Sequence, residues 1–266
     1  MPSSWVGTAD AYDVSFAQLC AGTVEAFIAA LGPAGGGRLM LDAGCGPGTV
    51  AFAARRAGFG AVGVDADPSM LDLAHRKDPA TVLICGSLPN LPFAQGQFDA
   101  VVANFVVNHT PDPRASVRDL ARVTRPGGRL ALTIWTAVVG PMNQLWNDVM
   151  AAASVERPPA KTLPPDKDFD RTVAGLAGLL AEARLTDVAV FEVNWLFSIT
   201  AVNLWQAVVG GIPTIGQTYQ AQQPVVQDRM RDAYLQLTSK QHPSGEMRLP
   251  SSALLATATS KAAEPA

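Results

Sequence analysis

The chain has 266 residues, of which 48% are apolar and 16% charged, so it can bury a sizeable core and is not an intrinsically disordered protein. Its net charge of −3 and its scattered lysines and arginines argue against a nucleic-acid partner. Three dispersed cysteines argue against a disulfide framework or a metal site, and Cys45 and Cys85 are expected to be small buried residues. The sequence shows neither a membrane-spanning run nor a secretory signal, so we expect a soluble, cytoplasmic protein.

Short apolar runs alternate with helical patterns along most of the chain. Strands that are apolar throughout and separated by helices indicate a parallel sheet covered on both faces, so the expected fold class is α/β. In such a sheet a ligand binds beyond the carboxyl ends of the strands. We expect strands near 38–43, 61–65, 81–85, 98–104, 129–135, 187–197 and 247–259, and helices near 16–31, 49–57, 68–77, 113–124, 142–152 and 172–184, with further helices in 200–242.

A glycine-rich turn follows the first expected strand, which ends at Asp42. The glycines alternate, at Gly44, Gly46 and Gly48, before a helical pattern begins. Glycine lets the backbone turn sharply and lets a ligand approach it closely, while the free N–H groups of the next helix favour a negatively charged ligand group. The dinucleotide-binding fingerprint G-x-G-x-x-G would require a glycine where Thr49 stands, so the spacing departs from it.

Asp65 ends the second expected strand, about 20 residues after the first glycine of the turn. A carboxylate at this place can accept hydrogen bonds from both ribose hydroxyls of a nucleoside. NAD enzymes share this feature, so Asp65 indicates a nucleoside ligand without saying which one. Its alternative role is that of a turn or N-cap residue ahead of Pro68.

The run Asp42-x-Gly44-x-Gly46-x-Gly48 resembles motif I of the class I S-adenosylmethionine-dependent methyltransferases. Later segments are similar to further motifs of that family and follow in the same order. Near the N-terminus, Tyr12-Asp13 followed by Phe16 is similar to the start of many small-molecule members. The later segments are Val62–Leu71, Leu91–Phe93 with Gln97–Asp99, Asn108–Pro113 and Arg122–Leu130, and with motif I they cover about residues 38–135.

This resemblance implies S-adenosylmethionine as the cofactor and S-adenosylhomocysteine as its product. It also implies a doubly wound, Rossmann-like sheet of seven strands whose last strand is antiparallel. After the third strand the family usually has an acid at the adenine amino group, whereas this chain has Ser87, whose hydroxyl can accept the same bond. The positions matched to cofactor-binding residues are Asp42, Gly44, Cys45, Gly46, Asp65, Ala66, Met70, Ser87, Leu88, Asn104 and Phe105.

Two irregular blocks, residues 138–171 and 200–245, interrupt the alternation of strands and helices. Together with residues 1–37, they are expected to form a helical cap that binds the substrate. The expected division is completed by a cofactor-binding core at 38–137, the rest of the sheet at 172–199 and 246–259, and a flexible tail at 260–266.

Aromatic side chains concentrate outside the cofactor-binding strands, which suits an apolar or aromatic small substrate, although most of them are expected to be core residues. They are Trp5, Tyr12, Phe16, Trp135, Trp146, Trp195, Phe197 and Trp205.

His109 is the best candidate for a general base, because the ordinary pKa of histidine lies near working pH. Its alternative role is to satisfy backbone groups at the start of a helix. Tyr12 is a second catalytic candidate. With three histidines and no dense acidic cluster, no metal site is expected.

We therefore expect methyl transfer to a carbon, nitrogen or oxygen atom of a small, mostly hydrophobic or aromatic acceptor, of the kind used in secondary metabolism. The active species would be a monomer or a homodimer, with no nucleic-acid or membrane partner. A nicotinamide-dependent oxidoreductase and a non-catalytic S-adenosylmethionine-binding protein stay open as alternatives.

Overall fold

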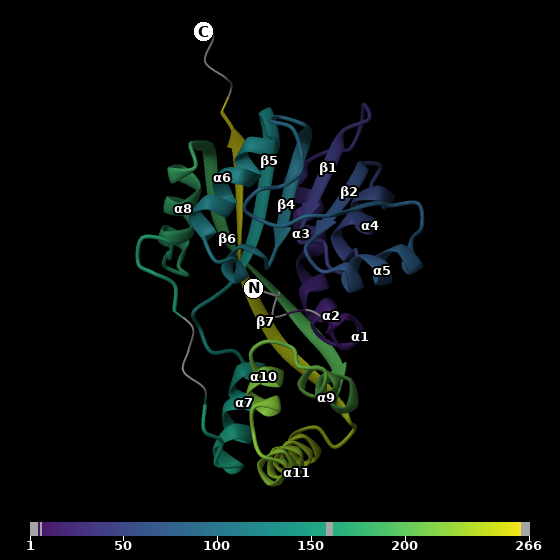
Figure 1. The fold of residues 1–266 in the computed structure, drawn as a ribbon, viewed down its shortest axis with the longest axis vertical. Coiled ribbons are helices and arrows are strands. Elements are labelled where there is room, and N and C mark those ends of the chain that lie inside the picture. Colours follow the sequence, from purple (N-terminus) through teal and green to yellow (C-terminus); the bar gives the residue numbers. More distant parts are fainter. Residues whose placement is uncertain (1–4, 6, 158–161, 262–266) are drawn as a thin grey trace. The chain divides into compact units, whose positions relative to one another are not determined.

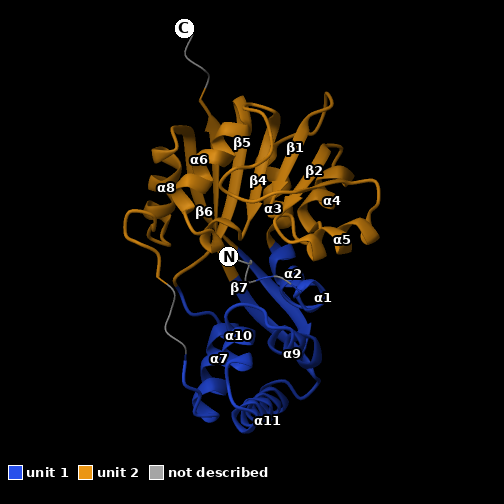
Figure 2. Ribbon diagram, in the orientation of Figure 1, with its two compact units in different colours: residues 1–22, 138–161, 194–251 blue, residues 23–137, 162–193, 252–266 orange. Residues whose placement is uncertain are grey.

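The computed structural model describes residue 5 and residues 7–157 and 162–261. The chain divides into two compact units (Figure 2). The sheet unit comprises residues 23–137, 162–193 and 252–266, and the helical unit comprises residues 1–22, 138–161 and 194–251. The helical unit contains most of the segments expected to form a cap, whereas residues 23–37 and 162–171 belong to the sheet unit. That the helical unit acts as a cap stays a prediction.

Seven strands form one sheet in the order β3-β2-β1-β4-β5-β7-β6 (Figure 1). Parallel pairing joins β3, β2, β1, β4 and β5 in turn, and β7 runs antiparallel to β5. This is the α/β class with the antiparallel strand that the sequence led us to expect. The strands are β1 (Leu39–Ala43), β2 (Gly60–Asp65), β3 (Val82–Cys85), β4 (Phe98–Asn104), β5 (Thr124–Trp135), β6 (Leu185–Thr200) and β7 (Glu246–Ser260).

Helices cover both faces of the sheet, because successive side chains of a strand point to opposite faces. One face packs against α3 (Val24–Leu31) and α4 (Thr49–Arg56), and the other against α6 (Pro113–Val123) and α8 (Val173–Glu182). α5 (Pro68–Lys77) contacts β2 and β3. Fully buried side chains include Phe27, Met40, Ala54 and Val102 on the first face and Leu41, Val101, Leu120 and Leu176 on the second.

The helical unit has an aromatic cluster in its interior. Tyr234 stacks on Trp146 with ring centroids 5.4 Å apart, and Trp205 lies 4.9 Å from the Tyr234 ring. The Tyr234 hydroxyl donates to the Ala201 carbonyl at 2.7 Å, which satisfies the polar end of this buried ring. The helices of this unit are α1 (Ala9–Asp13), α2 (Phe16–Cys20), α7 (Pro141–Ala152), α9 (Ala201–Val209), α10 (Ile215–Gln220) and α11 (Pro224–Gln241).

No helix within the described ranges has the length and apolar character needed to cross a membrane.

The structure corrects several expectations about single elements. The helix expected over 16–31 is interrupted by a 3₁₀ turn, η1 (Ala21–Thr23), at Gly22, where a Cβ would lie 2.2 Å from the Trp195 ring. Cys85 is exposed, not buried, because β3 is an edge strand of the sheet. β5 already begins at Thr124, since a register shift opposite β4 accommodates the glycine-containing segment before residue 129.

The expected tail starts one residue later than the sequence indicated. Ser260 is the last residue of β7, and residues 262–266 lie outside the described residues.

Candidate functional site

The carboxyl ends of four neighbouring strands bring the candidate cofactor-binding residues together in the sheet unit. β3, β2, β1 and β4 are parallel, and the register pairs Asp42 with both Gly63 and Val102, and Asp65 with Cys85. Parallel strands end at the same edge of a sheet, so the turns that follow them meet there. Every position matched to the cofactor site lies on one of these strand ends, in the turn after it, or on α5.

The glycine turn after β1 presents bare backbone at this edge. Gly44 and Gly46 have positive φ values of 72° and 50°. The N–H groups of Gly44 and Cys45 both donate to the Val64 carbonyl, at 2.7 and 3.0 Å, which ties the turn to β2. A Cβ at Gly44 would lie 2.4 Å from Val106 Cγ2, so glycine is required there for both conformation and space.

Asp42 is a buried carboxylate with one unsatisfied oxygen. Its Oδ2 accepts a hydrogen bond from the Ala51 N–H of α4 at 2.9 Å, and the residue is 1% exposed. Its Oδ1 has no hydrogen-bond partner among the described residues. Burial raises the pKa of Asp42 from 3.8 to about 7, with a further rise from the Asp65 charge and an opposing effect of the Ala51 bond. Such a buried acceptor offers a place for a donor or cationic group of a ligand.

Asp65 is the last residue of β2 and lies beside the glycine turn that follows β1. Its Oδ2 accepts from the Gly46 N–H at 2.8 Å and its Oδ1 from the Asp67 N–H at 2.9 Å. Each oxygen keeps a second lone pair that can accept from a hydroxyl group. Burial raises the pKa of Asp65. The N-cap of α5 is Asp67, which accepts from the Ser69 N–H, so Asp65 does not cap that helix. The Asp65 bond to the Asp67 N–H, two residues on, does give Asp65 the role of a turn residue.

The other matched positions differ in exposure. Cys45 and Met70 are buried, Leu88 is half-buried, and Ala66 and Ser87 are exposed. A ligand can therefore reach Ala66 and Ser87 directly, whereas Cys45 and Met70 mainly pack beneath the surface. A Cβ at Gly63 would lie 2.9 Å from Cys45 Sγ, so Cys45 fits closely against β2.

Asn104 and Phe105 form a corner at the end of β4. Asn104 Oδ1 accepts hydrogen bonds from the hydroxyls of Thr133, at 2.7 Å, and Thr23, at 2.9 Å. The Phe105 N–H donates to Thr133 Oγ1 at 3.0 Å, and Phe105 has a positive φ of 58°. The Phe105 ring stacks on Trp135, with centroids 3.9 Å and planes 17° apart. Two hydroxyls and an aromatic stack thus hold this corner in place.

Sequence reasoning missed Thr23 and Thr133 at this corner and grouped Trp135 with aromatic residues outside the cofactor-binding strands. Trp135 ends β5 within the sheet unit, as the strand expected over 129–135 placed it. Thr133 pairs with Asn104 in the β4–β5 register, and its polarity inside an apolar strand was the available signal. Thr23 had no local signal, because its partner lies far along the chain.

His109 lies in the sheet unit, in the 3₁₀ turn η2 (Val107–His109) after β4. The residue is solvent-exposed, with Nε2 3.4 Å from Asn108 Nδ2, yet desolvation by the surrounding protein lowers its pKa. Its ring is therefore neutral near pH 7. The N-cap of α6 is Asp112, which accepts from the Ala115 N–H at 2.8 Å, so His109 does not cap that helix.

Tyr12 lies on α1 in the helical unit. Its hydroxyl donates to Cys20 Sγ at 3.6 Å, and its ring meets that of Trp5 edge-on at 5.6 Å. Burial raises the pKa of Cys20 to about 12. These contacts pack Tyr12 within its own unit, and its catalytic role stays a prediction.

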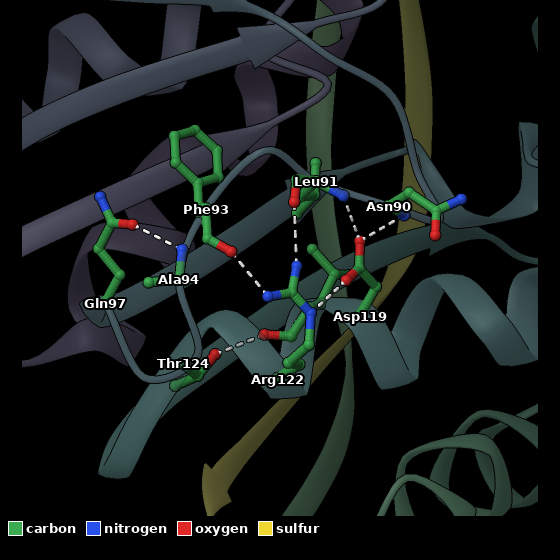
Figure 3. A network of polar contacts seen from close by, with 9 residues as sticks. Asn90, Leu91, Phe93, Ala94, Gln97, Asp119, Arg122 and Thr124 are labelled. Atoms are coloured by element: carbon green, nitrogen blue, oxygen red, sulfur yellow. Dashed lines mark hydrogen bonds and ion pairs between the residues drawn. The ribbon is translucent and has the colours of Figure 1, made fainter.

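The connection between β3 and β4 is held by an ion pair on α6 (Figure 3). Asp119 accepts from the N–H groups of Asn90, at 2.7 Å, and Leu91, at 2.6 Å. Arg122 pairs with Asp119 at 2.8 Å and donates to the carbonyls of Phe93, at 2.7 Å, and Leu91, at 3.0 Å. Arg122, which begins one of the motif-like segments, and Asp119 therefore support the loop that follows β3.

Residues 41–132 match a family model described as "Methyltransferase domain". An uncharacterised methyltransferase of Mycobacterium sp. (strain JLS) is 40% identical over 40% of this chain and 42% of its own length. A demethylmenaquinone methyltransferase of Paenarthrobacter aurescens is 34% identical over 42% of this chain and 44% of its own length. The chain thus spans less than half the length of these relatives.

A solved structure shares the fold over most of the chain. It is phosphoethanolamine N-methyltransferase 2 of Haemonchus contortus, in complex with phosphomonomethylethanolamine and S-adenosylhomocysteine. The similarity has a TM-score of 0.54 and 18% sequence identity, and it covers 91% of this chain and 52% of that one.

Proposed function

We propose, starting from the match of residues 41–132 to the methyltransferase domain model, that the protein transfers a methyl group from S-adenosylmethionine to a small molecule. S-Adenosylhomocysteine would be the second product. When bound, this cofactor supplies an electrophilic methyl group on a positively charged sulfur. The residues at the carboxyl ends of β1–β4 fit it. The observation that carries the proposal is the buried Oδ1 of Asp42 beside the glycine turn, which has no hydrogen-bond partner in the part of the chain that the structure describes.

Two carboxylates divide the binding of the cofactor's charged and sugar parts. Asp42 offers its free oxygen to the ammonium group, since a buried carboxylate gains most from a cationic partner. Asp65 accepts from the ribose hydroxyls, because two backbone N–H groups already fix both of its oxygens. Gly44 and Gly46 let the backbone approach the ligand without side chains between them.

The adenine would lie near the end of β2 and the loop after β3. Ala66 flanks it on one side with Met70 packed beneath, and Ser87 and Leu88 contribute from the other strand end. Ser87 is exposed and can accept a hydrogen bond from the adenine amino group without carrying a charge. The Asp119–Arg122 pair keeps the loop that follows Leu88 in place.

The protein's own contribution to the reaction is alignment and exclusion of water, because the cofactor already carries an activated methyl group. Asn104 and Phe105 would lie beside its methionine part. The half-buried ring of Trp135, which stacks on the buried Phe105, gives this side of the site an apolar surface. A small, mostly hydrophobic or aromatic acceptor suits such a surface better than an ionic one.

His109 is the proposed proton acceptor for an acceptor molecule that needs one. Its lowered pKa leaves the imidazole neutral and able to take a proton near pH 7. Full turnover by a His109→Ala variant would remove it from the mechanism. An electron-rich carbon or a neutral amine acceptor would show that outcome, because neither needs strong base assistance.

Calorimetric titration with S-adenosylmethionine and, separately, with NAD tests the proposal. We expect binding of the first and none of the second. Asp65→Asn should weaken S-adenosylmethionine binding about 10- to 100-fold, because it removes one or two charge-assisted hydrogen bonds to the ribose hydroxyls. Asp99→Asn is the matched control, since Asp99 accepts from the Leu39 N–H at the opposite end of β1. Equal losses in both variants would contradict the assigned site.

A screen of small aromatic and apolar metabolites then tests catalysis through release of S-adenosylhomocysteine. Binding of the cofactor with no release for any acceptor would favour the non-catalytic alternative. Binding of NAD in place of S-adenosylmethionine would favour the oxidoreductase alternative.

A further inference from the structure

The 3₁₀ turn η2 places the side chains of Asn108 and His109 against each other. Asn108 Nδ2 lies 3.4 Å from His109 Nε2. Hydrogen bonds within the turn fix its backbone. The His109 N–H donates to the Val106 carbonyl at 2.9 Å, and the Thr110 hydroxyl donates to the Val107 carbonyl at 2.8 Å. The two side chains are therefore kept within reach of each other.

This contact decides which nitrogen of the neutral imidazole carries the hydrogen. A carboxamide nitrogen only donates hydrogen bonds, and an imidazole nitrogen accepts one only while it carries no hydrogen. In the orientation that the structure shows, Nε2 of His109 is therefore the unprotonated nitrogen and Nδ1 carries the hydrogen. At 3.4 Å this bond is long, so a donor that comes closer replaces it at little cost.

The carboxamide oxygen of Asn108 is left over in this arrangement. Oδ1 is buried and has no hydrogen-bond partner among the residues that the structure describes. Once Nε2 of His109 carries a proton, its N–H and those of the carboxamide oppose each other. A half-turn of the carboxamide removes this opposition and brings Oδ1 to the imidazolium N–H. A hydrogen bond from such a charged donor is about twice as strong as a neutral one.

We infer that Asn108 is a positioning residue for proton transfer at His109: its carboxamide donates to Nε2 while that atom carries no hydrogen, and turns over to accept from it once the proton has arrived. The inference rests on the proposed function, in which an O–H or N–H bond of the acceptor molecule breaks and its proton forms the Nε2–H bond. It concerns only the two atoms that face each other, so it holds alongside the other interactions of His109.

The charged groups at the start of α6 are paired with other side chains. η2 packs against α6 and β5. Asp112 of α6's N-cap pairs with Lys167 at 3.7 Å, and Arg114 pairs with Glu182. β5 ends in Thr133-Ile134-Trp135, none of which is ionisable in this pH range. The charge to which the Asn108 carboxamide responds is therefore that of the imidazole itself.

NMR spectra of the protein with ¹⁵N-labelled histidine give a readout without any ligand. Long-range ¹H–¹⁵N correlations distinguish the two neutral tautomers, and a His109→Gln variant assigns the signals among the three histidines. We expect neutral His109 to carry its hydrogen on Nδ1. A neutral ring with its hydrogen on Nε2 overturns the inference, and this result needs no variant of Asn108 to fold.

Two substitutions of Asn108 should move the pKa of His109 in opposite directions. Asn108→Leu removes both hydrogen-bonding atoms, so the pKa should fall, because the bond to the charged ring is the stronger of the two that are lost. Asn108→Asp keeps only acceptor atoms, so the pKa should rise and the hydrogen of the neutral ring should move to Nε2. A carboxamide that stays in its donating orientation predicts a higher pKa in Asn108→Leu. That rise, or an unchanged pKa, contradicts the inference.

Thr110→Val is the matched control. It removes the hydrogen bond to the Val107 carbonyl from the same turn and leaves the Asn108 carboxamide in place. This variant should unfold at a lower temperature, with the tautomer and the pKa of His109 unchanged. Equal pKa shifts in Thr110→Val and Asn108→Leu would mean that the turn as a whole sets the pKa, against the inference.

Turnover gives the last measurement. For an acceptor whose methylation needs His109, Asn108→Leu should lower kcat about 5- to 10-fold at an unchanged KM for S-adenosylmethionine, the effect of about one hydrogen bond in the transition state. An unchanged kcat contradicts the role of Asn108 in proton transfer. Full turnover by His109→Ala with every acceptor contradicts the proposed role of His109 instead, while the tautomer and the pKa still decide whether the two side chains are coupled. The two failures are therefore distinguishable.

Discussion

β1 and β4 are parallel neighbours, and each leaves the sheet through a residue with positive φ, but their ends differ. After β1 that residue is Gly44, and one oxygen of the buried Asp42 carboxylate has no hydrogen-bond partner within residues 7–157 and 162–261. After β4 it is Phe105, and the carboxamide of Asn104 has its oxygen bonded twice. The carboxylate at the end of β1 thus lacks a hydrogen-bond partner among the described residues, whereas the carboxamide oxygen at the end of β4 has two.

This difference separates a site that needs a ligand from a support that does not. An unsatisfied buried polar group destabilises a fold by about 1–3 kcal/mol, so a ligand that supplies the missing partner explains why it is kept. The end of β4 has no such deficit, and its bonds instead fix a side chain in one orientation. A bare glycine at one end and a stacked phenylalanine at the other fit these two roles.

The largest effect should appear in the pH dependence of stability. Asp42 has its pKa raised from 3.8 to about 7 by burial. Between these values the unfolded chain releases the proton and the folded protein keeps it, so the free energy of unfolding falls as pH rises and levels off above 7. The fall due to Asp42 should be about 4 kcal/mol, and Asp42→Asn should remove it in urea titrations from pH 4 to 8.

Asn104→Leu serves as the comparison from the other strand end. Asn104 does not titrate, so this variant should keep the slope of the wild-type protein. The pKa of Asp65 is also raised by burial, so Asp65 likewise lowers the free energy of unfolding as pH rises. It accounts for the pH dependence of stability that remains in the Asp42→Asn variant. A slope unchanged by Asp42→Asn contradicts the assignment.

Gly44→Ala should destabilise the protein by about 3 kcal/mol for two reasons. Alanine is strained in the left-handed conformation that Gly44 adopts, and its methyl group overpacks the turn. The added methyl group would lie 2.4 Å from Val106 Cγ2. Val106→Ala in the same protein should recover about 1 kcal/mol or more, because it removes the clash but not the backbone strain. Chemical denaturation of the single and double variants measures this coupling. Strictly additive effects would show that Val106 is not the obstacle.

Affinity for S-adenosylmethionine should rise about 10-fold between pH 6 and pH 8, as the carboxylate of Asp42 becomes ionised and able to pair with the ammonium group. 5′-Methylthioadenosine has no ammonium group and should bind equally at both pH values. Calorimetry at a series of pH values gives both curves. The same pH dependence for the two ligands would point to a different titrating group.

The smallest effect concerns the positive φ of Phe105. Phe105→Gly should be about 1 kcal/mol less destabilising than Phe105→Ala, because both lose the stack on Trp135 but only glycine takes the left-handed conformation without strain. This order is the reverse of that found in ordinary strands. Thermal unfolding of both variants decides it, and a more stable alanine variant would mean that the corner has relaxed.

Much of the sheet was predictable because its signals are local. Apolar runs such as 98–104, glycine turns and aspartate–proline helix starts each act within a few residues of the chain. Glycine spacing and the acid at the end of β2 likewise placed the candidate residues on neighbouring strand ends, where the structure has them. The exposure of Cys85 was not predictable in this way, since it depends on β3 being the last strand of its side.

The sequence by itself determined which strands form, where their turns need glycine, and that Asp42 and Asp65 end neighbouring strands. Tertiary structure alone decided that one oxygen of Asp42 is buried without a partner among the residues that the structure describes. It also decided that Thr23 and Thr133 meet at Asn104, and that Trp135 lies on Phe105. The reason is physical: backbone conformation follows from neighbouring residues, whereas hydrogen bonds and stacking between distant residues exist only once packing has brought them within a few ångströms of each other.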